Sequence, residues 1–258
     1  MEIKQLATSN IFQQQDRENC LSIANQQRAW IEINLKALGQ NVRQLKKILT
    51  PKTELMAVVK ADAYGHGAIT VAQTALANGA SCLAVATISE AIQLRQAEIN
   101  APILILGSIN NSEEIKAIAF WRLEPTLCNC DQALLYSKTM AEIGQILPVH
   151  LKLDTGMSRL GTNWQQATEF VKFTQGLPYL KIASIYSHLA TADDLDSTVM
   201  KLQQTRFEQA IAQLKDNGIT IPKLHLANSA ATLVDRSSHY DLVRVGLSIY
   251  GLYPARHL

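Results

Sequence analysis

The sequence predicts an α/β protein built as a (β/α)8 TIM-type barrel. Short apolar runs rich in β-branched residues alternate with stretches of helical periodicity, which is typical of parallel strands joined by crossover helices. Eight such runs begin from residue 55 onward, and eight strands close this type of barrel. A doubly wound open sheet fits the same alternation, but no run is followed by the glycine-rich turn of a dinucleotide site.

The eight predicted strands each end where polar or small residues follow an apolar run. They are LMAVVK ending at Lys60, CLAVAT at Thr87, ILILG at Gly107, LEPTLC at Cys128, VHLKLDT at Thr155, IASIYSHL at Leu189, KLHLANS at Ser229 and LVRVG at Gly246. Between the last strands, residues 198–215 are expected to form a crossover helix with Leu202 and Phe207 on its buried face.

The segment before the barrel is expected to be different in kind. Residues 1–27 form a Gln-rich polar leader, predicted to be disordered, and the barrel domain is predicted over 28–258. One extra strand, Trp30 to Ile33, precedes the eight. The four cysteines are interpreted as reduced packing thiols, so no metal site is predicted.

Composition argues for a small-molecule substrate. The 24 basic and 22 acidic residues nearly cancel without long runs of either sign, which disfavours nucleic acid and membrane surfaces as partners. No run approaches the roughly 18 apolar residues of a membrane span, and the leader is unlike a signal peptide. We therefore expect a cytoplasmic protein.

The most informative segment is AVVKADAYGHG, residues 57–67, in which an apolar strand leads into a polar loop. Lys60 ends the strand, and Asp62, Tyr64 and His66 follow it. A lysine amine that loses hydration at a strand end has a lowered pKa and forms Schiff bases with aldehydes or carbonyl groups. A lysine at such a position more often points into water, so Lys60 alone does not establish this chemistry.

Reactive side chains follow several other predicted strands. The active site of a barrel lies at the carboxyl ends of its strands, so such residues are expected to meet there. They are Lys152, Asp154 and Arg159 at and after the fifth strand, His188 in the sixth, Asn228 and Ser229 in the seventh, and Arg244 and Gly246 in the eighth.

Most of these residues also have a purely structural interpretation. His188 could cap the next helix, and Asn228 or Ser229 could be a helix N-cap. Asp154 and Arg159 could form an ion pair in their loop. For these positions the sequence leaves both interpretations open.

Arg244 is harder to explain structurally, because it lies between Val243 and Val245 inside a strand. A guanidinium there must find an acceptor in the barrel mouth or remain badly desolvated. Ser229 at a helix start, with Gly246 after the last strand, is also typical of a barrel phosphate site. Lysine, phosphate site, histidine and buried arginine together indicate pyridoxal phosphate as cofactor.

From about Arg28 to its end, the chain resembles the alanine racemase family, pyridoxal-phosphate enzymes of the barrel fold type. The motifs that carry the resemblance occur in the family's order: AVVKADAYGHG, LKLDTGMSRLG, YSHLATAD, HLANSAA and RVGLSIYGLYP. The resemblance implies interconversion of L-alanine and D-alanine, which supplies D-alanine for cell-wall peptidoglycan.

The resemblance also implies catalytic and cofactor-binding roles. Lys60 would hold the cofactor through a Schiff base and act as the base on one face of the α-carbon. His188 would lie against the pyridine ring, and Arg244 would face its nitrogen, which disfavours protonation of the ring. The phosphate and its surroundings would contact Tyr64, Asn228, Ser229, Gly246 and Leu247.

Two further positions follow from the same resemblance. Arg159 would contact the phenolic oxygen of the cofactor and the carboxylate side of the substrate. Lys152 matches a position often carbamylated in the family, where the added carboxylate would orient Arg159. A free Lys152 beside Arg159 would be a like-charge pair, so an anion is expected there.

The family places its second catalytic base, a tyrosine, in a C-terminal β domain that the partner subunit of a head-to-tail homodimer supplies. The given sequence ends at Leu258, just after the eighth strand, so this domain is expected to be missing and the activity of the chain is left open. The alternative is a barrel-only protein of pyridoxal-phosphate homeostasis. A substrate range broader than alanine also stays open.

Overall fold

The computed structural model describes residues 31–220 and 222–257. The described residues divide into two units at the boundary between Asn34 and Leu35. The predicted leader and Trp30 lie outside the described residues. Residues 31–33 form no strand, so the predicted extra strand is wrong in its described part. A strand needs a neighbouring backbone to complete its hydrogen bonds, and no described strand pairs with these residues.

The second unit is built on a parallel sheet in the order β8-β7-β5-β4-β3-β2-β1-β9, with the short β6 (Thr162–Asn163) pairing with β5. The eight strands of this path are β1 (Glu54–Val58), β2 (Cys82–Val85), β3 (Ile103–Ser108), β4 (Glu124–Leu127), β5 (Leu147–Asp154), β7 (Leu180–Tyr186), β8 (Leu224–His225) and β9 (Leu242–Val245).

Two backbone hydrogen bonds join the first and last strands of this order. The N–H of Asp241 donates to the carbonyl of Leu224 at 3.1 Å, and the N–H of Arg244 donates to that of Ala227 at 3.0 Å. The sheet therefore closes into a barrel, which confirms the predicted fold class. Seven of these strands end one to four residues before the predicted positions, and β3 ends one residue after its predicted end. The largest difference is at β8, which stops at His225 rather than Ser229.

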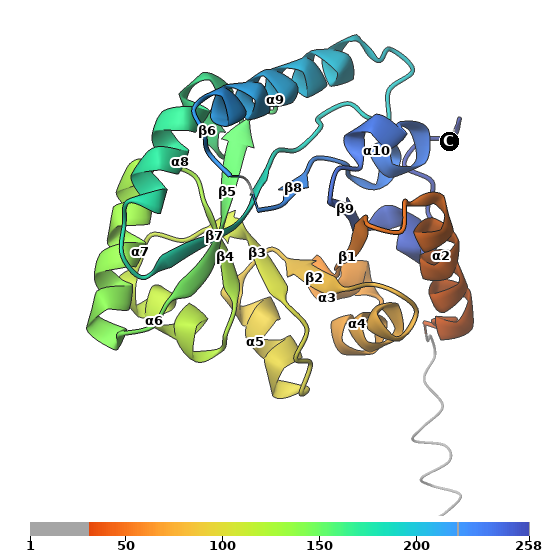
Figure 1. Cartoon of the computed structure of the whole chain (residues 1–258). Helices are drawn as coiled ribbons and strands as arrows, with labels where there is room; N and C mark the ends of the chain where they lie inside the picture. Colours follow the sequence, from red (N-terminus) through yellow and green to blue (C-terminus); the bar gives the residue numbers. More distant parts are fainter. Residues whose placement is uncertain (1–30, 221, 258) are drawn as a thin grey trace, which may run out of the picture. The chain divides into compact units, whose positions relative to one another are not determined.

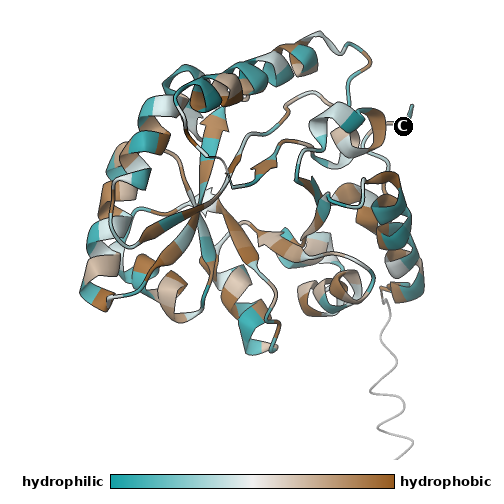
Figure 2. Cartoon of the chain, in the orientation of Figure 1, coloured by the Kyte–Doolittle hydropathy of each residue, from teal (hydrophilic) through white to brown (hydrophobic). Residues whose placement is uncertain are grey.

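Helices surround the strands in the second unit (Figure 1). They are α2 (Leu35–Ile48), α4 (Ala68–Ala77), α5 (Ile88–Gln96), α6 (Ser112–Phe120), α7 (Cys130–Ile143), α8 (Ala167–Gln175), α9 (Thr198–Asp216) and α10 (Ser229–Val234), with 3-10 turns η1 (Trp164–Gln166), η2 (Arg236–Ser238) and η3 (Leu247–Tyr250). Figure 2 shows hydrophobic residues concentrated in the strands, whereas α9 mixes hydrophobic and hydrophilic positions. No helix among the described residues is long and apolar enough to cross a membrane.

Helix α9 confirms the predicted crossover helix, with one correction. Phe207 is fully buried, but the side chain of Leu202 is 47% exposed, and Met200 and Gln203 are buried instead. Leu202 and Phe207 are five positions apart in the sequence, and this spacing places them on different faces of a helix with 3.6 residues per turn.

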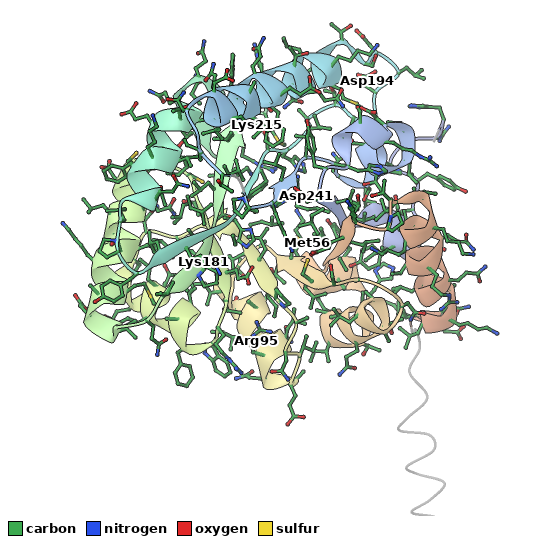
Figure 3. All side chains as sticks on the ribbon, in the orientation of Figure 1. Met56, Arg95, Lys181, Asp194, Lys215 and Asp241 are labelled. Carbon is green, nitrogen blue, oxygen red and sulfur yellow. The ribbon has the colours of Figure 1, made fainter. Side chains whose placement is uncertain are left out.

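The inside of the barrel has an apolar half and a polar half. Met56 and Val58 of β1 pack with Cys82, Ala84 and Leu104, and Figure 3 shows Met56 among the central strands while Lys215 lies on a surrounding helix. The remaining strands bury polar side chains, namely Thr126, His150, Lys152, Ser184, Tyr186, His225 and Arg244. Because these polar side chains are buried, they need hydrogen-bond partners within the protein.

The segment after β1 is a left-handed helical turn, α3 (Lys60–Gly65). Ala61, Asp62, Ala63 and Tyr64 have φ values between 49° and 54°. Left-handed backbone costs a residue with a Cβ about 1–2 kcal/mol. The turn is held by the Asp62 carboxylate, which accepts from the N–H of Ala68 at 2.7 Å, and by Glu90, which accepts from that of Ala61 at 2.7 Å.

We predict that Ala61→Gly raises the free energy of unfolding by up to about 1 kcal/mol. Ala61 is exposed, and glycine removes the Cβ that opposes its positive φ, although part of the gain is offset by a more flexible unfolded chain. The matched control is the exposed Ala141 of the right-handed helix α7, where Ala141→Gly should cost about 1 kcal/mol. Urea denaturation measures both, and equal destabilisation by the two changes would contradict the left-handed turn.

Candidate functional site

A cavity of about 370 Å³ lies at the carboxyl ends of the barrel strands. Ten of the residues predicted for the site line it together, although they come from five strand ends and a span of 188 positions in the sequence. They are Lys60, Tyr64, Lys152, Arg159, His188, Asn228, Ser229, Arg244, Gly246 and Leu247. Asp154, which was also expected there, lines a neighbouring cavity instead. The first cavity therefore brings these ten residues into one site.

Lys60 enters this cavity from the start of the left-handed turn. Its Nζ atom lies 5.9 Å from the centroid of the Tyr64 ring. The Tyr64 ring packs edge-on against Tyr250 at 5.2 Å, and the hydroxyl of Tyr250 donates to the carbonyl of Val58 at 3.0 Å. The end of β1 is thereby fixed to η3, so the lysine and the last turn of the barrel have a defined relative position.

Ser229 and Gly246 form a narrow part of the cavity beside Tyr64. The N–H of Gly246 donates to Oγ of Ser229 at 3.0 Å, which leaves the hydroxyl hydrogen of Ser229 available to a ligand. A Cβ on Gly246 would lie 3.0 Å from Oη of Tyr64 and 3.5 Å from Cβ of Val58. Only glycine keeps this space open.

Asn228 has the structural role that was left open. Its side chain caps α10 by accepting from the N–H of Ala231 at 3.1 Å, and it donates to the carbonyl of Leu189 at 3.2 Å. Asn228 thereby links the segment that follows β7 to the segment that follows β8, and it fixes the start of α10 beside Ser229.

Arg244 is buried in the barrel, with 4% of its surface exposed. Its Nη1 donates to Nδ1 of His225 at 2.9 Å, and its Nη2 lies 2.7 Å from the carbonyl oxygen of Ser187 and 3.1 Å from that of Leu226. Burial lowers the pKa of Arg244 to about 10, so the guanidinium stays charged at neutral pH. No carboxylate pairs with it among residues 31–220 and 222–257.

His188 contacts Arg244 rather than capping a helix. Its Nδ1 lies 3.2 Å from Nη2 of Arg244, and the next helix begins ten residues later at Thr198. Burial, followed by the positive charges of Arg244 and Lys152, lowers the pKa of His188 to about 2. The imidazole is therefore neutral over the physiological range.

Tyr186 lies beneath the cationic side chains. Its ring is fully buried and lies 5.1 Å from Cζ of Arg244 and 5.5 Å from Nζ of Lys152, distances at which an aromatic face attracts a cation. Burial, followed by the charges of Arg244 and Arg159, lowers the pKa of Lys152 to about 8. A substantial fraction of its amine is neutral just above neutral pH.

The loop after β5 places Arg159 at the mouth of the cavity. The suggested ion pair with Asp154 does not form; Oδ1 of Asp154 instead accepts from the N–H groups of Gly156 at 2.9 Å and Ser158 at 3.0 Å. Gly161 has a φ of 116°, and a Cβ there would lie 2.9 Å from the carbonyl oxygen of Lys152. The loop folds back on its own strand because this position is glycine.

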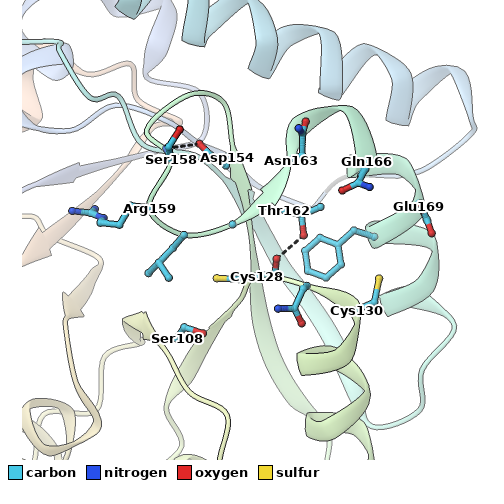
Figure 4. A pocket seen from close by; sticks show the side chains of 14 residues that line it. Ser108, Cys128, Cys130, Asp154, Ser158, Arg159, Thr162, Asn163, Gln166 and Glu169 are labelled. Carbon is cyan, nitrogen blue, oxygen red and sulfur yellow. Dashed lines mark hydrogen bonds between the residues drawn. The ribbon is translucent and has the colours of Figure 1, made fainter.

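The same loop separates the site from a second cavity of about 710 Å³, which Arg159 also lines (Figure 4). There Oγ1 of Thr162 donates to the carbonyl of Cys128 at 2.6 Å. In Figure 4 the side chain of Arg159 extends away from Cys130 and Glu169. The guanidinium thus belongs to the first cavity, and the second lies behind its loop.

Sequence reasoning missed three residues that the site depends on, namely Tyr186, His225 and Tyr250. Tyr186 and His225 stack with ring centroids 4.6 Å apart. The available signal for the first two was alternation in the later strands, where Ser184 and Tyr186 flank Ile185, and His225 lies between Leu224 and Leu226. Period-two polarity inside a barrel strand indicates side chains that point into the barrel.

Fold and site together define a (β/α)8 barrel protein with a lysine on its first strand-to-helix turn and a buried arginine on its last strand. The family model described as "Alanine racemase, N-terminal domain" matches residues 33–254. The chain belongs to the alanine racemase family.

Relatives and solved structures agree. Alanine racemases of Nostoc sp. and Synechocystis sp. are 65% and 62% identical, each over 90% of this chain but only 61% and 62% of their own length. A Clostridium difficile alanine racemase in complex with cycloserine matches 90% of this chain and 64% of its own, at 30% identity and a TM-score of 0.87. One from Bacillus anthracis with bound L-Ala-P gives 34% identity and a TM-score of 0.83 over 88% of this chain and 59% of its own. The chain spans about 60% of the length of these relatives.

We predict that His188 makes the folded protein less stable as pH falls. Below pH 6.5 the unfolded chain binds a proton at this imidazole, while the folded protein does not, because burial lowers the folded-state pKa. Each pH unit below about 6.5 should therefore cost about 1.4 kcal/mol of unfolding free energy. Urea denaturation at several pH values between roughly 4.5 and 6 measures how steeply the unfolding free energy falls as pH falls.

In His188→Gln the unfolding free energy should fall less steeply with decreasing pH, by the amount that His188 contributes. In the control His257→Gln, whose side chain is exposed, this pH dependence should be unchanged. Equal slopes for the protein and His188→Gln would contradict a buried neutral imidazole.

Proposed function

We propose that this chain binds pyridoxal phosphate and acts in the interconversion of L-alanine and D-alanine. The observation that carries the proposal is the single cavity into which Lys60, Ser229 and Arg244 all project, in a chain of the alanine racemase family. The cofactor, when bound, supplies an aldehyde that condenses with amines and a ring that stabilises negative charge at the α-carbon.

The residues of the cavity fit this cofactor. The hydroxyls of Ser229 and Tyr64 flank the open space at Gly246, which suits the oxygens of a phosphate group, and the backbone at Leu247 borders the same space. Asn228 fixes this part of the cavity through the start of α10. At the other end, Lys60 offers an amine to the aldehyde.

Arg244 and His188 define the electrostatics of the ring site. The charged guanidinium donates hydrogen bonds and has no proton to give near neutral pH, so it favours a ring nitrogen that stays unprotonated. The neutral imidazole of His188 adds no further positive charge. Both side chains favour return of the α-proton over wider delocalisation of negative charge.

Arg159 and Lys152 are proposed to recognise the carboxylate side of the substrate. In this role the guanidinium of Arg159, at the cavity mouth, binds the carboxylate. Lys152 has a pKa of about 8, and a neutral amine is the form that adds carbon dioxide to give a carbamate with release of a proton. That carbamate would place an anion among Arg159, Arg244 and Lys60.

The proposed partner is a second copy of the protein, as the resemblance to a head-to-tail homodimer implies. Exposed apolar side chains support a covered surface around η3 and α10. Leu252 is 51% and Tyr253 74% exposed, and both line a cavity with residues of α2.

We predict that the chain binds pyridoxal phosphate with a visible absorption band that is lost in Lys60→Ala. The band reports the covalent bond between Nζ of Lys60 and the cofactor aldehyde. The matched control is Lys47→Ala, an exposed lysine of α2, which should keep the band. An unchanged band in Lys60→Ala would contradict the proposal.

The same samples test catalysis. Incubated with D-alanine in deuterated buffer, the chain should incorporate deuterium at Cα, observed by NMR, because Lys60 serves one face of that carbon. Lys60→Ala should incorporate none. Cofactor binding without any deuterium incorporation by the unmodified chain would instead favour the alternative, a barrel protein that only carries pyridoxal phosphate.

A further inference from the structure

A continuous chain of hydrogen bonds crosses the polar half of the barrel from β4 to the cavity. Nε2 of His150 lies 2.7 Å from Oε2 of Glu124, and Nδ1 of His150 lies 2.6 Å from Oγ of Ser184. Oγ of Ser184 lies 2.7 Å from Nε2 of His225, whose Nδ1 lies 2.9 Å from Nη1 of Arg244. The five side chains come from five different strands.

The strand register explains why these side chains meet. His150 of β5 is the direct partner of Ser184 of β7, and Lys152 is that of Tyr186 one layer nearer the cavity. Tyr186 in turn pairs with His225 of β8. His150, Ser184 and His225 are at most 5% exposed, so each must find its hydrogen-bond partners within the protein.

The direction of the first two bonds is fixed by Arg244. A guanidinium has donors and no acceptor, so Nδ1 of His225 must carry the lone pair. His225 is neutral, since burial and the charge of Arg244 hold its pKa well below the ordinary value, and its proton therefore lies on Nε2. That N–H donates to Ser184.

The direction of the remaining hydrogen bonds follows from counting the donors and acceptors of each side chain. The hydroxyl of Ser184 accepts from His225, so its own hydrogen is directed to Nδ1 of His150. The proton of His150 is then on Nε2 and donates to the carboxylate of Glu124. Every group donates toward Glu124, and no member is left without a partner.

We propose that Glu124, His150 and Ser184 are positioning residues for Arg244. Their shared role is to fix the hydrogen-bond direction that keeps His225 an acceptor, and so to hold the guanidinium charged and in place at the cavity. Glu124 ends the chain at the amino end of β4, on the side of the barrel opposite the cavity. The proposal rests on the proposed function only where it links Arg244 to pyridoxal phosphate.

The first test needs no cofactor. Long-range ¹H–¹⁵N NMR of the chain, labelled at histidine, reports which ring nitrogen carries the proton; the six histidines are assigned by single substitutions. We expect the Nε2-protonated form for both His150 and His225. A doubly protonated His150, or a proton on Nδ1 of either ring, would overturn the proposal.

A matched pair of variants tests the role of Glu124. Glu124→Gln removes the charge but keeps an acceptor, so His150 should stay protonated on Nε2. Glu124→Met removes both, so the proton of His150 should move to Nδ1 and the hydroxyl of Ser184 should turn to donate to Nε2 of His225. The proton of His225 then moves to Nδ1, where it faces Arg244 and no longer accepts from it. The same tautomer in both variants would contradict a chain directed by Glu124.

The closing experiment measures pyridoxal phosphate affinity by absorbance. Ser184→Ala and Glu124→Met should each weaken binding about tenfold, the scale of one buried hydrogen bond left unmade, while Glu124→Gln should not. The control is Ser137→Ala, a buried serine of α7 whose hydroxyl donates to the carbonyl of Pro178 at 2.7 Å, outside the hydrogen-bond chain and the cavity. Equal losses in Ser184→Ala and Ser137→Ala would overturn the positioning role. If the unmodified protein binds no cofactor but shows the expected tautomers, the proposed function is overturned, whereas the hydrogen-bond chain from Glu124 to Arg244 is supported.

Discussion

The rest of the site depends on one constraint, a guanidinium buried inside a closed barrel without a carboxylate partner among the described residues. Arg244 keeps its charge only because carbonyl oxygens of Ser187 and Leu226 and the lone pairs of two imidazoles surround it. Those contacts require neutral histidines, and a neutral His225 in turn requires the partners that Ser184 supplies. Glu124, His150, Ser184, His225 and Arg244 are therefore one connected hydrogen-bond network rather than separate buried groups.

The apolar half has the opposite task. Met56, Val58 and Leu104 pack against one another without polar partners, and they support the strand that ends in the left-handed turn at Lys60. That turn is costly for residues with a Cβ, so its hydrogen bonds to Asp62 and Glu90 are needed to hold it. Strain of this kind is common where a loop must present reactive groups in a fixed arrangement, and here it directs Lys60 and Tyr64 into the cavity.

Much of this arrangement was predictable from the sequence, since the alternation of apolar runs and the polar residues at strand ends depend on periods of 2 and 3.6 that any barrel imposes. Ten of the predicted site residues accordingly share one cavity. The chain from Glu124 to Arg244 was not predictable, because it depends on the register that sets His150 opposite Ser184. The left-handed turn at Ala61 was missed because alanine favours right-handed helix. The extra strand predicted from Trp30 to Ile33 does not form in its described part, residues 31–33, because strand propensity says nothing about whether a partner strand is present.

The most direct test of this account is the ¹⁵N chemical shift of the pyridine nitrogen in labelled pyridoxal phosphate bound to the chain. A permanently charged Arg244, held by His225 and donating into the cavity, predicts a ring nitrogen that accepts a hydrogen bond and remains unprotonated across the neutral range. A shift typical of a protonated pyridinium would contradict the account, because it would require an acid or an anion where the structure places a guanidinium.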